Sequence, residues 1–502
     1  MKSLHPVLII FCIVIVSGTD KIAAQNNTAA LRHFNQERIS FYELQWENPA
    51  FMPFYPVDDY MDASIGMYQL KANETHLVQM GDQHSAFTFD AHSYKQINSQ
   101  TFWGTAGYQK GNMKNQRWIS NADYALTTPY IMADLSGGDV NYENYRFKGG
   151  YANAWRNIYW GIGGDYATGN SYRQRDPRPL NRTSDLNLVG GLAYGVGHAY
   201  YLGVNGAYRS YKQTTDVTGY RESSDFYLIF MKGFGLYDKF FSQVVNNMGV
   251  LYELKGTAFS AQLLPVRVNG WRISVKNLQN TMNQEEIGAF KTISQLTTRQ
   301  KEAEVGYRWP TEKGMSQVKI YAHLMNKDGK EFNYGIGGKL INSVTKYKQE
   351  LYDLGFSWGG QYSTKGRQYV YQLTSALYHD KSRHISPAAS QTIDLLKIDA
   401  RVGGHFRVKK SWLAVKQKIG FTKAVNTSLQ TSVHAFENAN DQMVIPNFEF
   451  RSASYFLTDT EIRYDFKRRE NWNVYIQGAF QSFLFQKVAP TNVFKLAIGI
   501  AI

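Results

Sequence analysis

The chain has 502 residues, of which 43% are hydrophobic, 15% aromatic and 19% charged, and its formal net charge at pH 7 is +14. This apolar share argues against an intrinsically disordered protein. After the N-terminus, no stretch approaches the roughly 18 consecutive apolar residues that a membrane-spanning helix needs, which excludes a helical membrane protein.

The N-terminus has the pattern of a cleaved secretory signal peptide. A single lysine precedes a short apolar run, and small residues precede the predicted cleavage between Ala24 and Gln25. The chain's one cysteine, Cys12, lies inside this segment, so the predicted mature protein has neither disulfides nor thiol chemistry. We therefore expect residues 1–24 to direct export and to be removed.

Residues 25–60 are predicted to form an N-terminal arm or a short helix before the strands begin. The stretch 26–47 is helical in character, with apolar residues at mixed spacing. We expect this arm on the periplasmic side, either at the mouth of the barrel predicted below or folded into its lumen.

Residues 61–502 alternate apolar and polar side chains with the period of two that strands have. The pattern is clear in NWNVYIQGAFQSFLF and recurs at 186–196, 200–209, 303–309 and 413–421. The predicted strands are long enough to cross a bilayer when tilted, and aromatic residues flank their aliphatic middles. Because a sheet in lipid must close on itself, the pattern predicts an all-β fold, a transmembrane antiparallel outer-membrane β-barrel. A soluble secreted β-protein is the alternative.

Turn signals divide this region into about nine hairpins and about 18 strands, within a range of roughly 14 to 22. Bacterial barrels have short periplasmic turns and long external loops. The predicted short turns lie at 95–99, 153–156, 195–198, 264–270, 310–314, 363–367, 409–411 and 467–471. The predicted long external segments lie at 72–83, 111–144, 169–185, 212–250, 280–299, 326–348, 380–391 and 424–453, and a short connection at 486–490 completes the nine hairpins.

The external segment 169–185 is rich in arginine. We take Arg173, Arg175, Asp176, Arg178 and Arg182 as a candidate anion- or lipid-binding loop, because the planar guanidinium group suits bidentate recognition of phosphate. Two prolines predict a stiff, extended segment at 176–179 that does not pair as a strand. Alternatively, Asp176 and Asp185 each hold an arginine, and the loop is only braced internally.

A second external segment, 212–250, contains the apolar run FYLIFMKGFGLYDKFF. A rigid sheet that displays long loops often uses them for function. This run is expected to pack into the lumen as a gate, to lie on the membrane or to face a partner.

Charged residues lie on the predicted inner faces of several strands. The candidate lumen-facing residues are Glu302, Glu304, Arg308, Lys319, Lys416 and Lys418. A barrel of this size can hold a water-filled lumen, and the positive net charge would favour anions there. Alternatively, these charges pair across neighbouring strands and fill the interior.

The chain ends in VFKLAIGIAI, which again alternates apolar and polar or small residues. This ending is similar to the C-terminal assembly signal of outer-membrane barrels. It departs from that signal in one respect, because Ile502 stands where an aromatic residue is usual.

Four motifs carry a resemblance to a known family: WENPAFM, TTPYIMADLSGGDVNYENYRFKGGYA, WGIGGDYATGNSYRQRDPRPLNRTSDL and MNKDGKEFNYG. Along nearly the whole mature chain, the sequence resembles a group of Bacteroidota outer-membrane β-barrel proteins known only as a domain of unknown function. The resemblance implies the location and the fold. It implies no substrate and no catalytic residues.

Enzymatic and metal-binding interpretations find little support. His379 and Asp380 with His384, and Glu285 with Glu286, are the best catalytic candidates, but His and Asp are common at solvated strand ends. The histidines are scattered without metal-ligand spacing. We expect no enzyme, no metal, no cofactor and no nucleic-acid partner.

The sequence therefore predicts a protein of the outer membrane of a Gram-negative bacterium, in contact with outer-membrane lipid and lipopolysaccharide. Its predicted function is a channel for passive or partner-assisted passage of small solutes, anionic ones among them. The alternative is a non-conducting accessory or scaffold barrel that partners a surface lipoprotein, a TonB-dependent receptor or a secretion machine.

Overall fold

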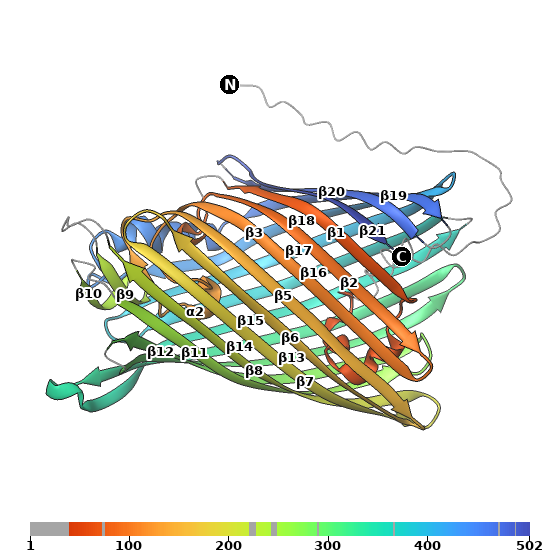
Figure 1. Cartoon of the computed structure of the whole chain (residues 1–502), viewed down its shortest axis with the longest axis horizontal. Coiled ribbons are helices and arrows are strands. Elements are labelled where there is room, and N and C mark those ends of the chain that lie inside the picture. Colours follow the sequence, from red (N-terminus) through yellow and green to blue (C-terminus); the bar gives the residue numbers. More distant parts are fainter. Residues whose placement is uncertain are drawn as a thin grey trace, which may run out of the picture.

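The computed structural model describes residues 40–72, 76–219, 227–241, 248–288, 291–364, 367–469, 472–486 and 488–501. Within these residues, eighteen strands form one closed antiparallel sheet, in which β1 (Tyr60–Lys71) pairs with β21 (Thr491–Ala501) (Figure 1). The predicted all-β antiparallel barrel of about 18 strands is confirmed. The predicted signal peptide (1–24), residues 25–39 of the arm and Ile502 lie outside the described residues.

Every other barrel strand pairs with its neighbours along the chain. These strands are β2 (Gln83–Ile97), β3 (Gln100–Gln116), β5 (Gly138–Trp155), β6 (Ile158–Arg173), β7 (Arg178–Val196), β8 (Tyr200–Thr218), β11 (Met248–Pro265), β12 (Gly270–Ile287), β13 (Lys291–Thr311), β14 (Gly314–Tyr334), β15 (Leu340–Thr364), β16 (Arg367–His384), β17 (Ala389–Val408), β18 (Ser411–Gln430), β19 (Tyr455–Arg469) and β20 (Trp472–Phe485).

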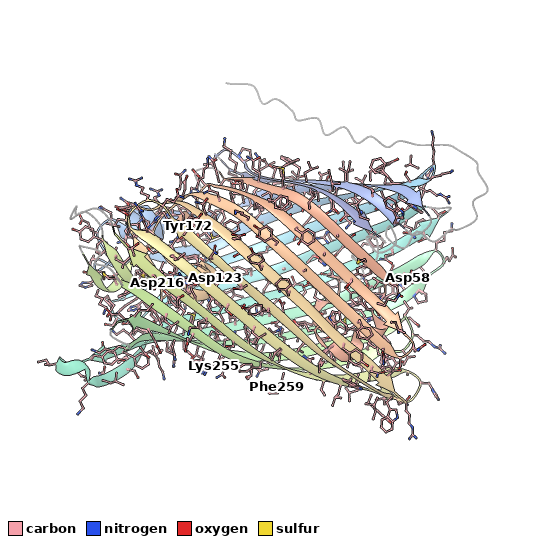
Figure 2. The ribbon with its side chains drawn as sticks, in the orientation of Figure 1. Asp58, Asp123, Tyr172, Asp216, Lys255 and Phe259 are labelled. Atoms are coloured by element: carbon pink, nitrogen blue, oxygen red, sulfur yellow. The ribbon has the colours of Figure 1, made fainter. Side chains whose placement is uncertain are left out.

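The outer face of the barrel is apolar. In β21, Phe494, Leu496 and Ile498 are each at least 38% exposed, whereas the intervening residues point inward. Phe259 of β11 likewise projects from the outer surface (Figure 2). Such a continuous exposed apolar band is stable only against lipid, so the protein is a large outer-membrane β-barrel.

The predicted short turns all lie between consecutive strands, but several predicted long loops are wrong in extent. Between β14 and β15, only residues 335–339 leave the ladder, and the two strands form a hairpin that extends beyond the other loops (Figure 1). The β6–β7, β12–β13 and β16–β17 connections are similarly short. Outside the bilayer both faces of a strand meet water, so the apolar alternation ends although the hydrogen-bonded ladder continues.

Short helices occupy both ends of the barrel. They are η1 (Glu43–Glu47), η2 (Pro49–Phe54), η3 (Val78–Met80), α2 (Tyr124–Thr127), η4 (Ile336–Gly338), η5 (Asn440–Val444) and α3 (Ile445–Arg451). Among the described residues, no helix has the length and apolar character to cross a membrane. The arm helices η1 and η2 lie at the end with the short turns (Figure 1). Since bacterial barrels have their short turns in the periplasm, we call this end the periplasmic end and the opposite one the external end.

A folded cap occupies the external end of the lumen. It contains the three-stranded sheet of β4 (Met132–Asp134), β9 (Leu228–Gly233) and β10 (Leu236–Phe241), together with α2, η5 and α3. Residues 228–241 belong to the apolar run, so of its three predicted placements the structure has the one inside the lumen.

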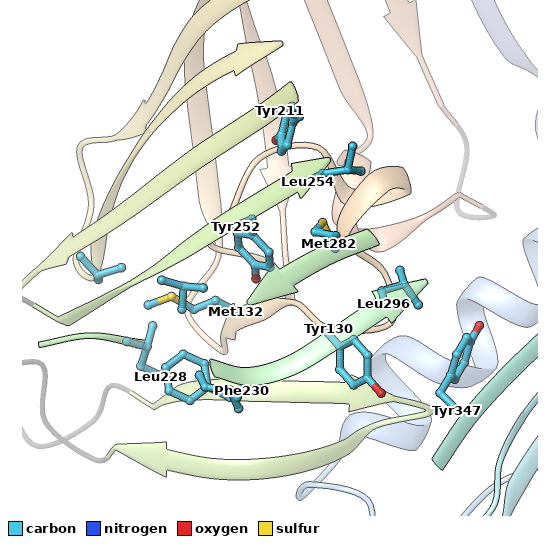
Figure 3. Packing of buried hydrophobic residues seen from close by; sticks show 13 residues of the cluster. Tyr130, Met132, Tyr211, Leu228, Phe230, Tyr252, Leu254, Met282, Leu296 and Tyr347 are labelled. Carbon is cyan, nitrogen blue, oxygen red and sulfur yellow. The ribbon is translucent and has the colours of Figure 1, made fainter. Parts of the chain in front are cut away.

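The cap packs on the barrel wall through an apolar core (Figure 3). Tyr130, Met132, Leu228 and Phe230 of the cap contact inward side chains of five strands. Those inward residues include Tyr211, Tyr252, Leu254, Met282, Leu296 and Tyr347. A second core joins Trp118 and Ile229 to Phe436 and Met443 of the β18–β19 connection. Burial of these large side chains holds the cap in place.

The outward position of Leu496, in the middle of β21, gives a first prediction. Leu496→Arg places a charge in the lipid and is expected to lower the free energy of unfolding by about 2–4 kcal/mol. Gln481→Arg on β20, which points into the lumen opposite Asp459, is the control and should cost much less because it stays out of the lipid. The measurement is the urea midpoint of unfolding in phospholipid vesicles. Equal losses in both variants would contradict the assigned faces.

Candidate functional site

The N-terminal arm fills the periplasmic end of the lumen. Asn48 is fully buried and begins η2, because its Oδ1 accepts a hydrogen bond from the Ala50 N–H at 3.0 Å. Its Nδ2 donates to Gln262 Oε1 of β11 at 3.0 Å. Ala50 and Phe51 are also fully buried. The three residues Asn48, Pro49 and Ala50 therefore fix the arm to the inner wall.

Three inward glycines, Gly161, Gly191 and Gly203, form a glycine seat beneath the arm on β6, β7 and β8. A Cβ atom at Gly191 would lie 2.0 Å from Asn48 Oδ1, and one at Gly203 would lie 2.5 Å from Phe51 Cζ. At Gly161 it would lie 2.7 Å from Pro49. A glycine inside a strand often marks the close approach of another segment, and that signal identifies this seat, which the sequence interpretation missed.

Basic residues of the opposite wall hold the start of the arm. The guanidinium groups of Arg272 and Arg308 lie 5.4 Å from the ring centre of Tyr42, whose hydroxyl donates to the Val318 carbonyl at 3.0 Å. Lys319 lies over the ring of Phe41 at 5.5 Å. Cation–π contacts of this kind contribute about 0.5–2 kcal/mol each. Two predicted lumen residues, Arg308 and Lys319, thus bind the arm.

All six predicted lumen residues lie on the inner face and contact polar partners. Glu304 binds Lys319 at 3.0 Å, and Arg308 donates to Gln317 at 2.7 Å. The remaining pairs are Glu302 with Lys276 at 3.6 Å, Lys416 with Glu461 at 3.5 Å and Lys418 with Asp399 at 3.4 Å. The geometry matches the interpretation in which inward charges pair across strands.

A chamber of about 1480 Å³ lies in the lumen between the arm and the cap. Trp46 and Tyr55 of the arm line one end, and Asp123 of the cap lines the other, where Tyr211 donates to it at 2.6 Å. Figure 2 shows Asp123 close to the external end of the barrel. Burial raises the pKa of the Asp123 carboxyl, and the hydrogen bond from Tyr211 opposes this shift.

The chamber lining carries both signs of charge. Among its described residues are eight carboxylates, against six Lys and Arg side chains. These are Glu47, Asp62, Asp90, Asp123, Asp165, Asp185, Asp459 and Glu461, and Arg146, Lys148, Lys276, Lys416, Arg463 and Lys495. Several form ion pairs, such as Arg146 with Asp165 at 2.5 Å. The chamber therefore has no excess of positive charge that would concentrate anions.

Arg173 of the arginine-rich hairpin holds the cap. Its side chain is 1% exposed, and Nη2 donates to Asp134 Oδ2 of β4 at 2.6 Å. The same guanidinium donates to the Pro177 carbonyl, and Asp134 also accepts from Ser120 Oγ at 2.6 Å. We call this buried pair the Arg173–Asp134 latch. Asp134 lies in a different loop from Arg173, so no pattern in the sequence around Arg173 predicts this pair.

The other arginines of the loop lie nearer the surface, whereas Asp176 is buried. Arg178 pairs with Asp176 at 2.7 Å and Arg182 with Asp216 at 3.1 Å, while Arg175 is exposed. Asp185, the other predicted brace, binds Arg209 of β8 rather than a loop arginine. Phosphate or lipid binding by this loop stays a prediction.

The expectation that 176–179 does not pair as a strand is wrong in part. Strand β7 begins at Arg178, and Pro179 lies opposite Val217 of β8. A proline is tolerated there because the first residues of a strand can do without one ladder donor.

The best catalytic candidates of the sequence form structural pairs: His379 binds Asp394 of β17, Glu285 accepts from Thr292 of β13 at 3.5 Å, and the other three connect to the cap. Asp380 binds Arg451 of α3 and accepts from Gln349 at 2.9 Å. His384 lies 2.8 Å from Glu331, which also binds Lys232 of β9 at 2.7 Å. Glu286 pairs with Lys239 of β10. Within the described part of the chain, no group of three or more His, Cys, Asp or Glu residues has the arrangement of a metal site.

Breaking the Arg173–Asp134 latch gives the second prediction. Arg173→Gln leaves the Asp134 carboxylate buried without its cation and should destabilise the closed cap by about 3–5 kcal/mol. Amide hydrogen exchange of β4 and β9 measures this loss. Arg182→Gln, which breaks an exposed pair, is the control and should cost about 0–1 kcal/mol. If both variants exchange alike, the latch does not hold the cap.

The glycine seat gives the third prediction. Gly191→Ala places a methyl group against Asn48 and should weaken arm docking by about 1–3 kcal/mol. Gly190→Ala on the same strand is a matched control, because nothing lies within 4 Å of its Cβ position. Hydrogen exchange of residues 40–57 should rise in the first variant alone. Unchanged exchange in Gly191→Ala would show that the arm does not depend on the seat.

A model of a family of unknown function (DUF6850) matches residues 49–502. No curated protein matches the sequence. Similar solved structures include BauA, the ferric preacinetobactin receptor from Acinetobacter baumannii, with 8% identity and a TM-score of 0.41 over 88% of this chain and 80% of that chain. The copper transporter OprC matches with 8% identity and a TM-score of 0.43 over 89% and 81% of the two chains.

The ferric-catecholate import receptor Fiu from E. coli K12 in its open form matches with 6% identity. Its TM-score is 0.40, over 89% of this chain and 82% of that chain. All three scores lie below 0.5, so the barrel fold rests on the strand pairing above and not on these likenesses.

Proposed function

Since the chain belongs to a family of unknown function (DUF6850), we propose its function from its lumen: partner-assisted passage of small polar solutes across the outer membrane. In this proposal the described conformation is the closed state. The observation that carries it is the polar chamber between two folded segments of the chain, the arm and the cap.

Both ends of the lumen are obstructed, and this favours assisted passage over passive passage. A permanently open pore needs a lumen that is free at both mouths, whereas here Asn48 and Phe51 occupy one and the apolar core of the cap occupies the other. Both obstructions are held by non-covalent contacts. A partner that binds the arm or the cap better in its displaced state would shift the equilibrium toward opening.

The chamber charges support polar solutes without an anion preference. A lumen that selects ions carries an excess of one sign, and the lining described above has similar numbers of both. The positive net charge of the whole chain is therefore a poor guide to the solute. This revises the expectation that the lumen favours anions.

Conductance of the purified protein in planar bilayers tests the proposal and is the fourth prediction. The wild type should be silent or open rarely. A double variant should show stable ohmic openings with weak ion selectivity; it lacks arm residues 25–57, and each of its three cap segments, 118–136, 219–247 and 431–453, is replaced by a short Gly-Ser linker. Each single deletion should conduct less than the double variant, because one obstruction remains.

The matched control shortens the β14–β15 tip by removing residues 336–339, which lie outside the lumen, and should stay silent. A double variant that folds but does not conduct would refute passage. A wild-type protein with stable openings would refute gating and favour a passive channel.

The accessory role is the second candidate function, and the projecting β14–β15 hairpin favours it. Ile336 is fully exposed, and Leu340 and Ile341 are 48% and 68% exposed. Exposed apolar side chains on a rigid projection fit contact with a partner. A silent double variant, together with a wild type that co-purifies in fixed ratio with a surface lipoprotein or receptor, would favour this role.

A further inference from the structure

We infer that the chamber contains a binding subsite for a neutral saccharide, built around Trp103. The inference rests on the proposed function, since it names the class of solute that passes. It starts from the register of β3, β5, β6 and β7. This register places a row of inward residues that contains Trp103, the Trp103 row, directly beside a polar row.

The Trp103 row consists of Trp103, Gly150, Gly163 and Val189, which pair in order across the four strands. A Cβ atom at Gly150 would lie 2.1 Å from Trp103 Cζ2, and one at Gly163 would lie 3.8 Å from it. The indole ring therefore lies against the wall where two glycines leave room. Because Trp103 also lines the chamber, part of its ring is open to a solute.

The arm completes one side of this platform. Trp103 packs on the apolar cluster of Met52, Tyr94 and Ala152, and Tyr55 of the arm packs on the same cluster. The Tyr94 hydroxyl donates to the Met52 carbonyl at 2.8 Å, which fixes arm and wall together. The docked arm therefore forms one side of the platform, while Trp103 itself belongs to the wall.

The polar row lies one inward position toward the cap and consists of Thr105, Lys148, Asp165 and Asn187. Successive inward residues of a strand are about 7 Å apart, a separation comparable with the width of a sugar ring. Arg146 follows and donates to both oxygens of Asp165, at 2.9 Å and 2.5 Å. A ring stacked on Trp103 would thus have its hydroxyl groups beside side chains of these types.

The chemistry of the two rows favours a hydroxyl-rich ligand. The face of an aromatic ring carries partial negative charge, so it attracts the C–H groups of a sugar and repels an anion. The row beside it offers Lys and Arg donors next to an Asp acceptor, and a hydroxyl group both donates and accepts. A neutral, hydroxyl-rich ligand satisfies both rows at once.

Isothermal titration calorimetry tests the inference and is the fifth prediction. The probes are maltohexaose, cellohexaose and laminarihexaose, in a detergent that has no sugar headgroup. Each is titrated into the full mature protein and into a variant that keeps the arm but has the three cap segments replaced by linkers, because the closed cap obstructs entry to the chamber. At least one should bind. Trp103→Ala should weaken that binding at least tenfold, Trp103→Phe should keep most of it, and Asp165→Asn should weaken it severalfold.

The matched control is Trp160→Ala on β6, which faces outward and is 36% exposed; it should bind as the wild type does. The subsite is refuted if none of the three saccharides binds, or if Trp103→Ala and Asp165→Asn both leave binding unchanged. It is also refuted if inorganic phosphate or trialanine binds more tightly than every saccharide.

The two proposals fail separately. If the double variant without arm and cap segments conducts, but neither the wild type nor the variant without the cap binds a saccharide, the saccharide subsite is refuted and the passage is kept. A silent double variant together with Trp103-dependent saccharide binding keeps the binding site and removes the passage.

Discussion

The hydrogen-bonding demand of the backbone in lipid governs the rest of this structure. Every N–H and C=O group in the bilayer needs a partner within the sheet, so eighteen strands close on themselves and β21 pairs with β1. Closure at this size creates a lumen too wide for wall side chains alone to fill. The chain fills its two ends with folded segments and leaves a polar chamber between them. Arm, cap and chamber are thus consequences of one constraint.

Two kinds of contact hold the end segments, and they differ in chemistry. The cap is bound by large apolar side chains and by buried ion pairs, of which Arg173 with Asp134 is an example. The arm is bound by close backbone approach at the glycine seat, by the Asn48 hydrogen bonds and by the cations beside Tyr42. Aromatic rings lying over inward glycines recur at both ends and in the chamber, since Tyr130 lies over Gly329, Phe51 over Gly203 and Trp103 over Gly150.

The periodicity of the sequence predicted the strands and their faces, because contact with lipid requires an apolar side chain at every second residue of a strand. The outward position of Ile476 and the inward position of Gln477 could therefore be predicted from the alternation in the sequence. The short turns could be predicted as well. The extents of the loops could not be predicted, because the β14–β15 ladder continues in water without alternation of apolar and polar residues. The partner of Arg173 was not accessible either: Asp134 is 39 residues away in sequence, and tertiary packing alone brings them together. Inward glycines such as Gly191 were a usable signal for the arm, although composition alone does not say what they face.

The position of the glycine seat has a consequence for biogenesis. Asn48 contacts β7 and β11, and Tyr42 binds β14, so the complete docking site of the arm spans strands from distant parts of the chain. The complete set of these contacts requires β7, β11 and β14 to be in place together. The arm precedes every strand in the sequence, yet its docking site is formed by strands that follow it by more than a hundred residues. The full docking of the earliest part of the described chain therefore has to wait for the wall from β7 to β14.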